Sequence, residues 1–177
     1  MIKKILLGVV VLLVVLAVVI QFQPATFSVT RAAAIGAPPE RVFELVNDFH
    51  NWQKWSPWAA LDPAAKYTYS GPASGNGAVC AWTGNDSVGE GRMTILASEP
   101  FTHIAIELEF FKPFPSAARN DFHFSVGNNG TEVTWTMSGD NNFLAKAVCL
   151  FMGGMDKMIG PDFERGLALM NSAAQGR

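Results

Sequence analysis

A chain of 177 residues with a formal net charge of −2 and a pI near 5.9 has room for one domain with a sizeable core. Its lysines and arginines are scattered and give no basic excess, which argues against nucleic acid as a partner. Aromatic residues make up 11% of the chain, a share that is typical of a folded protein and not of a disordered one.

The first element is an apolar run from Ile5 to Ile20, which Lys3 and Lys4 precede. Counted to Phe22, the run would span about 27 Å as a helix, which is short but sufficient for a bilayer core. The positive-inside rule keeps its basic end cytoplasmic. The run therefore predicts a single-pass membrane protein whose domain lies on the extracytoplasmic (periplasmic) side.

A cleaved signal peptide is the competing interpretation of this run. Cleavage requires small residues at the −3 and −1 positions, and the nearby candidate after Ala25 has Gln23 at −3. We therefore favour an uncleaved anchor over residues 1–23, with contact to the membrane through residues 5–22, followed by a domain over residues 24–177.

A strand over Thr26–Ile35 and a helix that begins at Pro38 or Pro39 are expected next. Proline at the first helical position has a preset φ, and Glu40 in the first turn complements the helix dipole. Three tryptophans, Trp52, Trp55 and Trp58, follow at steps of three. Because Pro57 prevents a regular helix from carrying all of them, we expect an irregular turn that caps an apolar space or closes the end of the core.

Short alternating segments then continue to residue 138, separated by turn signals such as Gly71-Pro72 and Gly127-Asn128-Asn129-Gly130. They predict antiparallel strands, which bring the total to seven. The segments are Lys66–Ser70, Ala78–Thr83, Gly91–Ser98, Thr102–Phe110, Ala118–Val126 and Thr131–Ser138.

The tail from Asn142 to Ala174 is expected to be helical, with a kink near Gly160-Pro161. Together these elements indicate an α+β protein with a helix-grip fold, in which a curved seven-stranded sheet wraps around a long kinked C-terminal helix. An N-terminal transmembrane helix precedes it.

Three segments carry a family resemblance: IGAPPERVFELVNDFHNWQKWSPW, VGEGRMTI at Val88–Ile95 and MDKMIGPDFERGLALM at Met155–Met170. The chain resembles, from about Phe27 to Ala173, bacterial members of the START-like superfamily labelled polyketide cyclase/dehydrase-type, also named SRPBCC. That superfamily includes lipid carriers, receptors, cyclases and oxygenase domains. The resemblance therefore implies a cavity and a hydrophobic ligand class, and it implies no particular reaction.

Alternation along the strands predicts which side chains face the helix. The inward sets are Ile104, Ile106 and Leu108; Phe122, Phe124 and Val126; Met93, Ile95 and Ala97; and Val133, Trp135 and Met137. The charged residues His103, Glu107, Asp121 and His123 fall on the outer face, where alternating charge is usually solvated sheet surface and only rarely a metal or acid/base site.

No cofactor or metal is expected. The three histidines lack the close spacing with a carboxylate that an iron site needs, and no nucleotide, zinc-protease or hydrolase motif occurs. Asp48, His50, Tyr67, Tyr69 and Glu90 are the polar residues near the ends of predicted elements that could orient a ligand. Cys80 and Cys149 could pair in an oxidising compartment, but without motif spacing they are more often free.

The leading hypothesis is a membrane-tethered domain that binds a hydrophobic small molecule or lipid in an internal cavity. The expected lining is Trp52, Trp55, Trp58, Tyr69, Trp82, Met93, Ile95, Ile106, Leu108, Trp135, Phe151, Met155 and Met158. A polyketide cyclase/dehydratase-like enzyme is the first alternative, and it requires an acid or base within reach of the substrate. A protein-interaction module of the cell envelope is the second, and its signature would be an exposed apolar patch.

Overall fold

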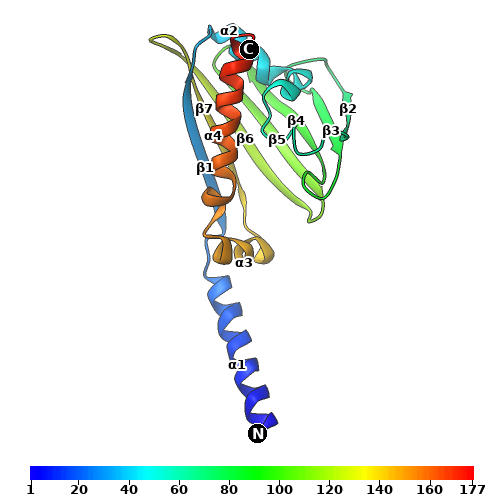
Figure 1. Cartoon of the computed structure of the whole chain (residues 1–177), viewed down its shortest axis with the longest axis vertical. Coiled ribbons are helices and arrows are strands. Elements are labelled where there is room, and N and C mark those ends of the chain that lie inside the picture. The colour runs from blue at the N-terminus through cyan, green and yellow to red at the C-terminus, as the bar shows by residue number, and fades with distance from the viewer.

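The computed structural model describes all residues, 1–177, and consists of a long N-terminal helix that projects from an α+β domain (Figure 1). The helices are α1 (Ile2–Gln21), α2 (Pro39–Asn47), the 3-10 helix η1 (Phe49–Lys54), α3 (Phe143–Met152) and α4 (Met155–Ala174). The strands are β1 (Thr26–Ile35), β2 (Lys66–Ser70), β3 (Val79–Thr83), β4 (Glu90–Glu99), β5 (His103–Lys112), β6 (Ser116–Gly127) and β7 (Gly130–Asp140).

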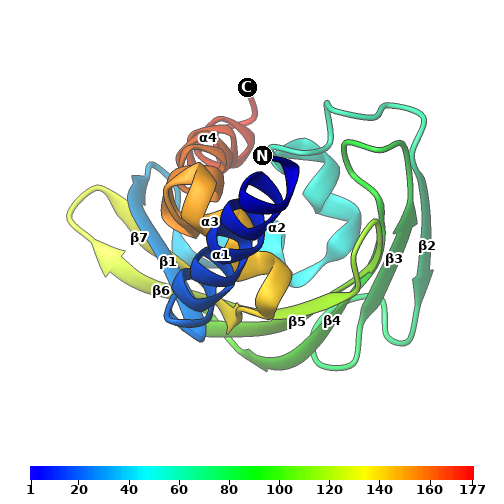
Figure 2. The same cartoon turned by 90° about the horizontal axis from the view of Figure 1, so that it is seen from below.

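All seven strands form one antiparallel sheet in the order β1-β7-β6-β5-β4-β3-β2. The sheet curves around one side on which α2, η1 and α4 lie, as the view from below shows (Figure 2). We refer to this side as the inner face and to the opposite side as the outer face. The predicted helix-grip fold, with its seven strands, is confirmed.

Helix α2 and η1 close one end of the inner face. Pro39 stands at the start of α2, and Val42, Phe43 and Val46 of the helix are buried. The indole N–H groups of Trp52 and Trp55 donate to the backbone carbonyls of Val46 and Leu45, which fixes η1 against the end of α2.

Aromatic stacking holds α4 against the centre of the sheet. Trp135 of β7 lies parallel to Phe163 of α4, with ring centroids 3.8 Å apart, and it also stacks on Phe122 of β6 at 5.0 Å. Trp55 meets both Trp135 and Phe122 edge-on. These rings are all buried, so the tryptophan turn and the last helix share one core with the sheet.

Two expectations about strand alternation are wrong. A register shift between Ile95 and Ala97 leaves Leu96 as an extra residue in β4, so that Ala97 lies opposite Ala105 on the outer face. Val126, near the end of β6, is 83% exposed because its strand extends beyond the packed helices.

The predicted single C-terminal helix is two helices, and the break lies earlier than expected. Gly153 and Gly154 have φ values of +83° and +97°, and the N–H groups of both donate to the carbonyl of Cys149, which ends α3. Helix α4 then runs without interruption through Pro161. The glycine pair, and not Gly160-Pro161, therefore separates the two helices.

Candidate functional site

Burial on the inner face falls along β5 and β7 toward the end where β5 stops and β6 begins. On β5, Ile104 and Ile106 are buried while Leu108 and Phe110 are half-buried. On β7, Trp135 is buried while Met137 is half-buried. The inner face thus has a closed end beneath α2, η1 and the middle of α4, and an open end.

Half-buried apolar and aromatic side chains cover this open end, and we name them the inner patch. It consists of Phe27, Tyr67, Tyr69, Trp82, Met93, Leu108, Phe110 and Met137 from the sheet, with Met155 and Ile159 from α4. Strand pairing places Met93 directly opposite Leu108, and Gly91 opposite both Trp82 and Phe110. A Cβ at position 91 would meet the Trp82 ring, so this glycine lets that ring lie flat across the strands.

The residues expected to line a pocket fall into three groups. Trp52, Trp55, Ile95, Ile106 and Trp135 belong to the closed end, where they are core side chains. Tyr69, Trp82, Met93, Leu108 and Met155 belong to the inner patch, and the half-buried Trp58 packs edge-on against Trp135 and Phe163 beside it. Met158 is half-buried on α4, whereas Phe151 lies on α3 and is 71% exposed.

Asp48, His50 and Tyr69 come together at the edge of the sheet. The Asp48 carboxylate accepts hydrogen bonds from the His50 backbone N–H and lies 2.7 Å from its Nδ1. The imidazole stacks on Tyr69 with ring centroids 3.9 Å apart, and burial raises the pKa of the Tyr69 phenol. His50 and Tyr69 border a depression of about 210 Å³ between η1 and the β2–β3 connection. Tyr69 is therefore a neutral hydrogen-bonding group at neutral pH.

The other polar residues near element ends are less suited to ligand chemistry. Glu90 forms an ion pair with Lys112 at 2.8 Å, across the start of β4 and the end of β5. Tyr67 lies opposite Trp82 in the inner patch. Neither residue joins the Asp48–His50 pair, so the chain does not assemble these five side chains into one site.

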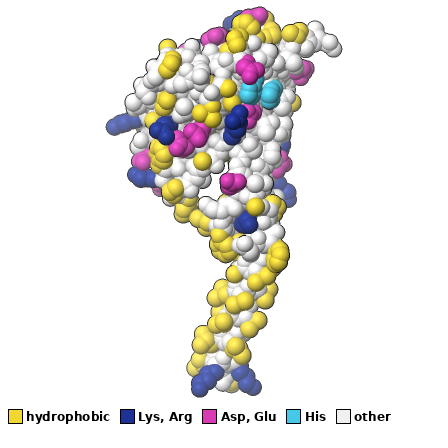
Figure 3. All heavy atoms as spheres, turned by 180° about the vertical axis from the view of Figure 1, so that it is seen from behind, with side chains coloured by type: hydrophobic (Ala, Val, Ile, Leu, Met, Phe, Trp, Pro, Cys, Tyr) yellow, Lys and Arg dark blue, Asp and Glu magenta, His cyan; other side chains and the backbone are white.

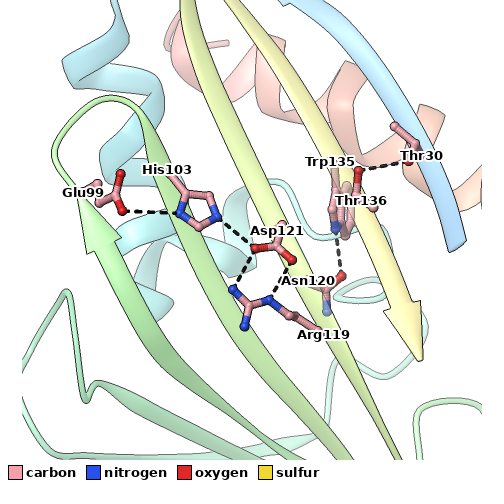
Figure 4. A network of polar contacts seen from close by, with 8 residues as sticks. All are labelled: Thr30, Glu99, His103, Arg119, Asn120, Asp121, Trp135 and Thr136. Atoms are coloured by element: carbon pink, nitrogen blue, oxygen red, sulfur yellow. Dashed lines mark hydrogen bonds and ion pairs between the residues drawn. The ribbon is translucent and has the colours of Figure 1, made fainter. Parts of the chain in front are cut away.

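The outer face carries a network of charged side chains around Asp121 (Figure 4). Its carboxylate lies 2.8 Å from both His103 Nε2 and Arg119 Nε, and His103 stacks on His123 with ring centroids 4.5 Å apart. Burial alone would raise the pKa of Asp121. The hydrogen bonds with Arg119 and His103 outweigh burial, so the pKa of Asp121 is lowered. No group of three His, Cys, Asp or Glu side chains in the chain is arranged to hold a metal ion.

A wider depression of about 630 Å³ lies on this outer face, below the charged side chains (Figure 3). Small residues of β1, β6 and β7 form much of its wall, including Ser28, Ala117 and Ser138, and Arg119 and Asp140 stand at its border. Neither this depression nor the one beside His50 lies between the sheet and α4. The inner patch is therefore an open apolar surface, which adjoins the two depressions only through Phe27 and Tyr69.

The two cysteines are free. Cys80 is buried in β3, where burial raises the pKa of its thiol to about 11, and Cys149 lies on α3. The structure thus answers the question of pairing that the sequence left open.

Sequence reasoning missed two polar residues on the inner face that strand alternation could have revealed. Asn120 is buried on β6, and its Oδ1 accepts the indole N–H of Trp135 at 2.9 Å. Arg31 of β1 lies opposite Trp135 and pairs with Asp156 and Glu164 of α4, at 2.8 and 2.7 Å. Asn120 shares the parity of Phe122, and Arg31 shares that of Val29, so both positions were predictable as inward.

Glycine at position 160 makes room for the Arg31 guanidinium. A Cβ at this position would overlap Nη2 of Arg31, so a larger residue would push the side chain out from beside α4. Because both carboxylates hold the charged guanidinium, the pKa of Arg31 is raised and that of Asp156 is lowered. Arg31 therefore joins the first strand to the last helix at the boundary between the closed and open ends.

Solved structures with this fold come from several bacterial proteins. One is an uncharacterised protein from Rhizobium leguminosarum, 16% identical, matched over 86% of this chain and 96% of that chain, with a TM-score of 0.63. Another is a protein from Mesorhizobium loti, 19% identical, over 82% and 97%, with a TM-score of 0.57. No curated protein matches the chain.

A third similar structure is the di-domain ARO/CYC StfQ from the steffimycin biosynthetic pathway, which is 9% identical with a TM-score of 0.59. The match covers 86% of this chain and 52% of StfQ, so the chain corresponds to about half of that protein. At such identities the likeness establishes the fold alone.

The family assignment comes from the sequence match, which covers nearly the whole domain and agrees with the fold. A family model described as polyketide cyclase / dehydrase and lipid transport matches residues 26–175. These are all seven strands with α2, η1, α3 and α4, so the resemblance seen in the sequence motifs is confirmed. The chain belongs to this polyketide cyclase/dehydrase and lipid transport family of the START-like superfamily.

Proposed function

We propose that this protein is a membrane-tethered domain that binds a hydrophobic small molecule or lipid against the inner patch. The observation that carries the proposal is the half-buried apolar surface on the inner face of the sheet. Each Å² of apolar surface left in water costs about 25 cal/mol relative to burial, so an apolar ligand that covers the patch gains free energy. Methionines at positions 93, 137 and 155 can adapt to ligands of different shape.

The distribution of ionisable groups supports binding over catalysis. The Asp48–His50 pair lies at the sheet edge beside η1, and Glu90 is neutralised by Lys112. Tyr69, whose pKa is raised by burial, offers a neutral hydroxyl to the inner patch. This hydroxyl can orient a polar group of a ligand, while the methionine and aromatic side chains contact its apolar part.

Helix α1 supports the membrane tether. It is long and apolar enough to cross a bilayer, and Ile20 is its only buried residue. A core helix of a soluble protein would instead bury one face. We infer that α1 remains attached and holds the domain at the extracytoplasmic surface, with Lys3 and Lys4 in the cytoplasm.

The proposal is tested by mass spectrometry of the full chain, extracted gently from its membrane with bound molecules retained. We expect an apolar small molecule or lipid in the wild-type sample. In the Met93→Gln/Leu108→Gln variant, which changes two paired positions of the inner patch, its occupancy should fall several-fold.

Leu96→Gln is the matched control, because Leu96 is an exposed apolar residue of the same strand at the bulge. It should leave the occupancy unchanged. Binding at the inner patch would be contradicted by a wild-type protein that carries no apolar molecule. It would also be contradicted if Leu96→Gln lowered the occupancy as much as the double variant does.

A further inference from the structure

Helix α3 presents an apolar face to the outside of the domain. Phe143, Leu144, Val148, Phe151 and Met152 are all exposed and recur at helical spacing, so they form one stripe. A helix on the surface of a soluble domain places polar residues there. An exposed apolar helix face of this kind marks a contact with a membrane or another protein.

Hydrogen bonds fix α3 next to the point where α1 ends. Lys146 of α3 donates to the carbonyl of Gln21, the last residue of α1. Asn141, just before α3, donates through its backbone N–H to Ala25 and through its side chain to Pro24. The level of α3 is therefore set by the C-terminal end of α1.

The length of α1 relates that level to a bilayer. Its 20 residues rise about 30 Å as an α-helix, which matches the thickness of a hydrocarbon core. With α1 across the membrane, Gln21 lies at the interface between lipid tails and head groups. Because α3 contacts Gln21, the apolar stripe of α3 lies at the level of the same interface.

A second apolar segment reaches toward the same side of the domain. The turn between β5 and β6 extends toward α3 and α1 (Figure 1), and Phe111 and Phe114 are exposed there. Hydrophobic side chains line this lower edge of the domain and continue onto α1 (Figure 3). The turn (113–115) and α3 contain no acidic residue. Lys146 lies on α3, and Lys112, which pairs with Glu90, ends β5 next to the turn; lysines at these positions suit the anionic surface of a bilayer.

We propose that α3 and the β5–β6 turn form a bilayer-docking surface, which lies in the interface of the membrane that α1 crosses. Phe114, Phe151 and Met152 enter the lipid, and the two lysines lie at the head groups. This inference rests on the proposed anchor and adds an orientation to it. In the view along α1, α3 lies in front of the open end of the inner face (Figure 2). Docking of α3 on the bilayer therefore places the inner patch next to lipid.

Spin labels in the reconstituted full chain test this orientation. Cys149→Ala removes the accessible thiol, and Cys80 stays unlabelled because it is buried with a pKa of about 11. Single cysteines then replace Phe151 on α3, Phe114 on the turn, Leu12 in α1 and Val126, which is exposed at the β6–β7 turn on the opposite end. The protein is placed in nanodiscs that contain zwitterionic and anionic phospholipids.

The measured quantity is the access of each label to oxygen, which concentrates in lipid, relative to a water-soluble nickel complex. We expect this ratio at positions 151 and 114 to be several-fold higher than at position 126, and highest at position 12. If the label at position 12 reports lipid while those at 151 and 114 match 126, the docking surface is refuted and the anchor stands. An aqueous label at position 12 would overturn both.

A protein partner for α3 is the other outcome of this experiment. If labels at positions 151 and 114 are shielded from oxygen and from the nickel complex alike, the stripe contacts protein in the nanodisc, and the bilayer proposal is wrong. A second measurement uses the double variant Phe114→Ser/Phe151→Ser. Val126→Ser is its control, because Val126 is also an exposed apolar residue. Amide hydrogen exchange of α3 in nanodiscs should rise in the first variant only.

Discussion

The two ends of the inner face differ although the same strands build both. On β7, Trp135 is 1% exposed, whereas Met137, two residues later on the same face, is only half-buried. The closed end is covered by α2, η1 and the middle of α4. The open end has α3 in front of it, and α3 packs mainly near α1. Cover by helices, and not strand alternation, therefore determines which inward residues become core.

The residue types differ between the ends as well. Stacked and edge-on aromatic rings fill the closed end, where Trp55, Phe122, Trp135 and Phe163 contact one another. Their indole N–H groups are bonded to protein acceptors, as with Trp135 and Asn120. The open end holds several methionines. This contrast teaches that the tryptophan turn stabilises the fold, while the open end is the part where we propose that a ligand binds.

Truncation of one residue at each end tests this contrast most strongly. Trp135→Ala removes the ring that stacks on Phe163 and leaves Asn120 without its hydrogen-bond partner. We expect it to lower the free energy of unfolding by about 3–5 kcal/mol. Met137→Ala, on the same strand and face, should cost about 1 kcal/mol, because Met137 is already partly in water. Chemical denaturation of both variants provides the comparison.

Equal losses of unfolding free energy in these two variants would show that the open end is as tightly packed as the closed end. A retained apolar ligand could produce that result by covering Met137. Denaturation after delipidation separates the two cases, because removal of the ligand should reduce the cost of Met137→Ala and leave that of Trp135→Ala unchanged.

Gly160 and Arg31 lie at the boundary between the ends and allow a second test. In a helix, alanine is more favourable than glycine by about 1 kcal/mol. At position 160, however, a Cβ would overlap the Arg31 guanidinium. We expect Gly160→Ala to lower the free energy of unfolding in the wild-type chain and to raise it in the Arg31→Ala background. The four proteins form a double-mutant cycle measured by denaturation.

The sign change is the informative outcome of this cycle. If Gly160→Ala has the same effect in both backgrounds, Arg31 does not occupy the space beside α4, and the contact between β1 and α4 rests on the aromatic stack alone. Ser172→Ala, at an exposed position of the same helix, should change the free energy of unfolding by less than about 0.5 kcal/mol in either background.

Strand alternation made most of the sheet predictable. Every expected strand exists, and Thr26–Ile35 and Lys66–Ser70 have the expected bounds. Alternation fails where the register shifts, as at Leu96, and where a strand extends past its covering helix, as at Val126. Both failures depend on contacts with other elements, which local sequence does not encode.

The helices show why the site was harder to predict than the fold. A single helix through residue 154 would place Phe151 above Met155 on the same face, so Phe151 was expected in the pocket. Because Gly153 and Gly154 end α3, that face turns outward and Phe151 is exposed. Likewise, the three tryptophans share a spacing, but Trp52 and Trp55 belong to the core and Trp58 lies at its boundary. Only the packing of η1 against α2 separates them.

On the outer face, Asp121 makes the stability of the fold depend on pH. Arg119 and His103 keep the pKa of Asp121 lower in the folded chain than in the unfolded chain, where it is about 4. The ionised carboxylate therefore stabilises the fold above pH 4, and this contribution is lost as the pH falls through the folded-state pKa. Because the network is partly exposed, its contribution should be below about 1 kcal/mol.

Unfolding of the wild-type chain and of Asp121→Asn, measured from pH 7 down to pH 2, isolates this contribution, because other titrating groups cancel in the difference. The difference should be largest at neutral pH and should disappear at the acid limit. If it grows as the pH falls, the carboxylate is held less favourably in the fold than in the unfolded chain, and burial of Asp121 outweighs its ion pairs. In Trp135→Ala the same pH-dependent difference should persist, because the stacked rings of the closed end carry no titrating charge.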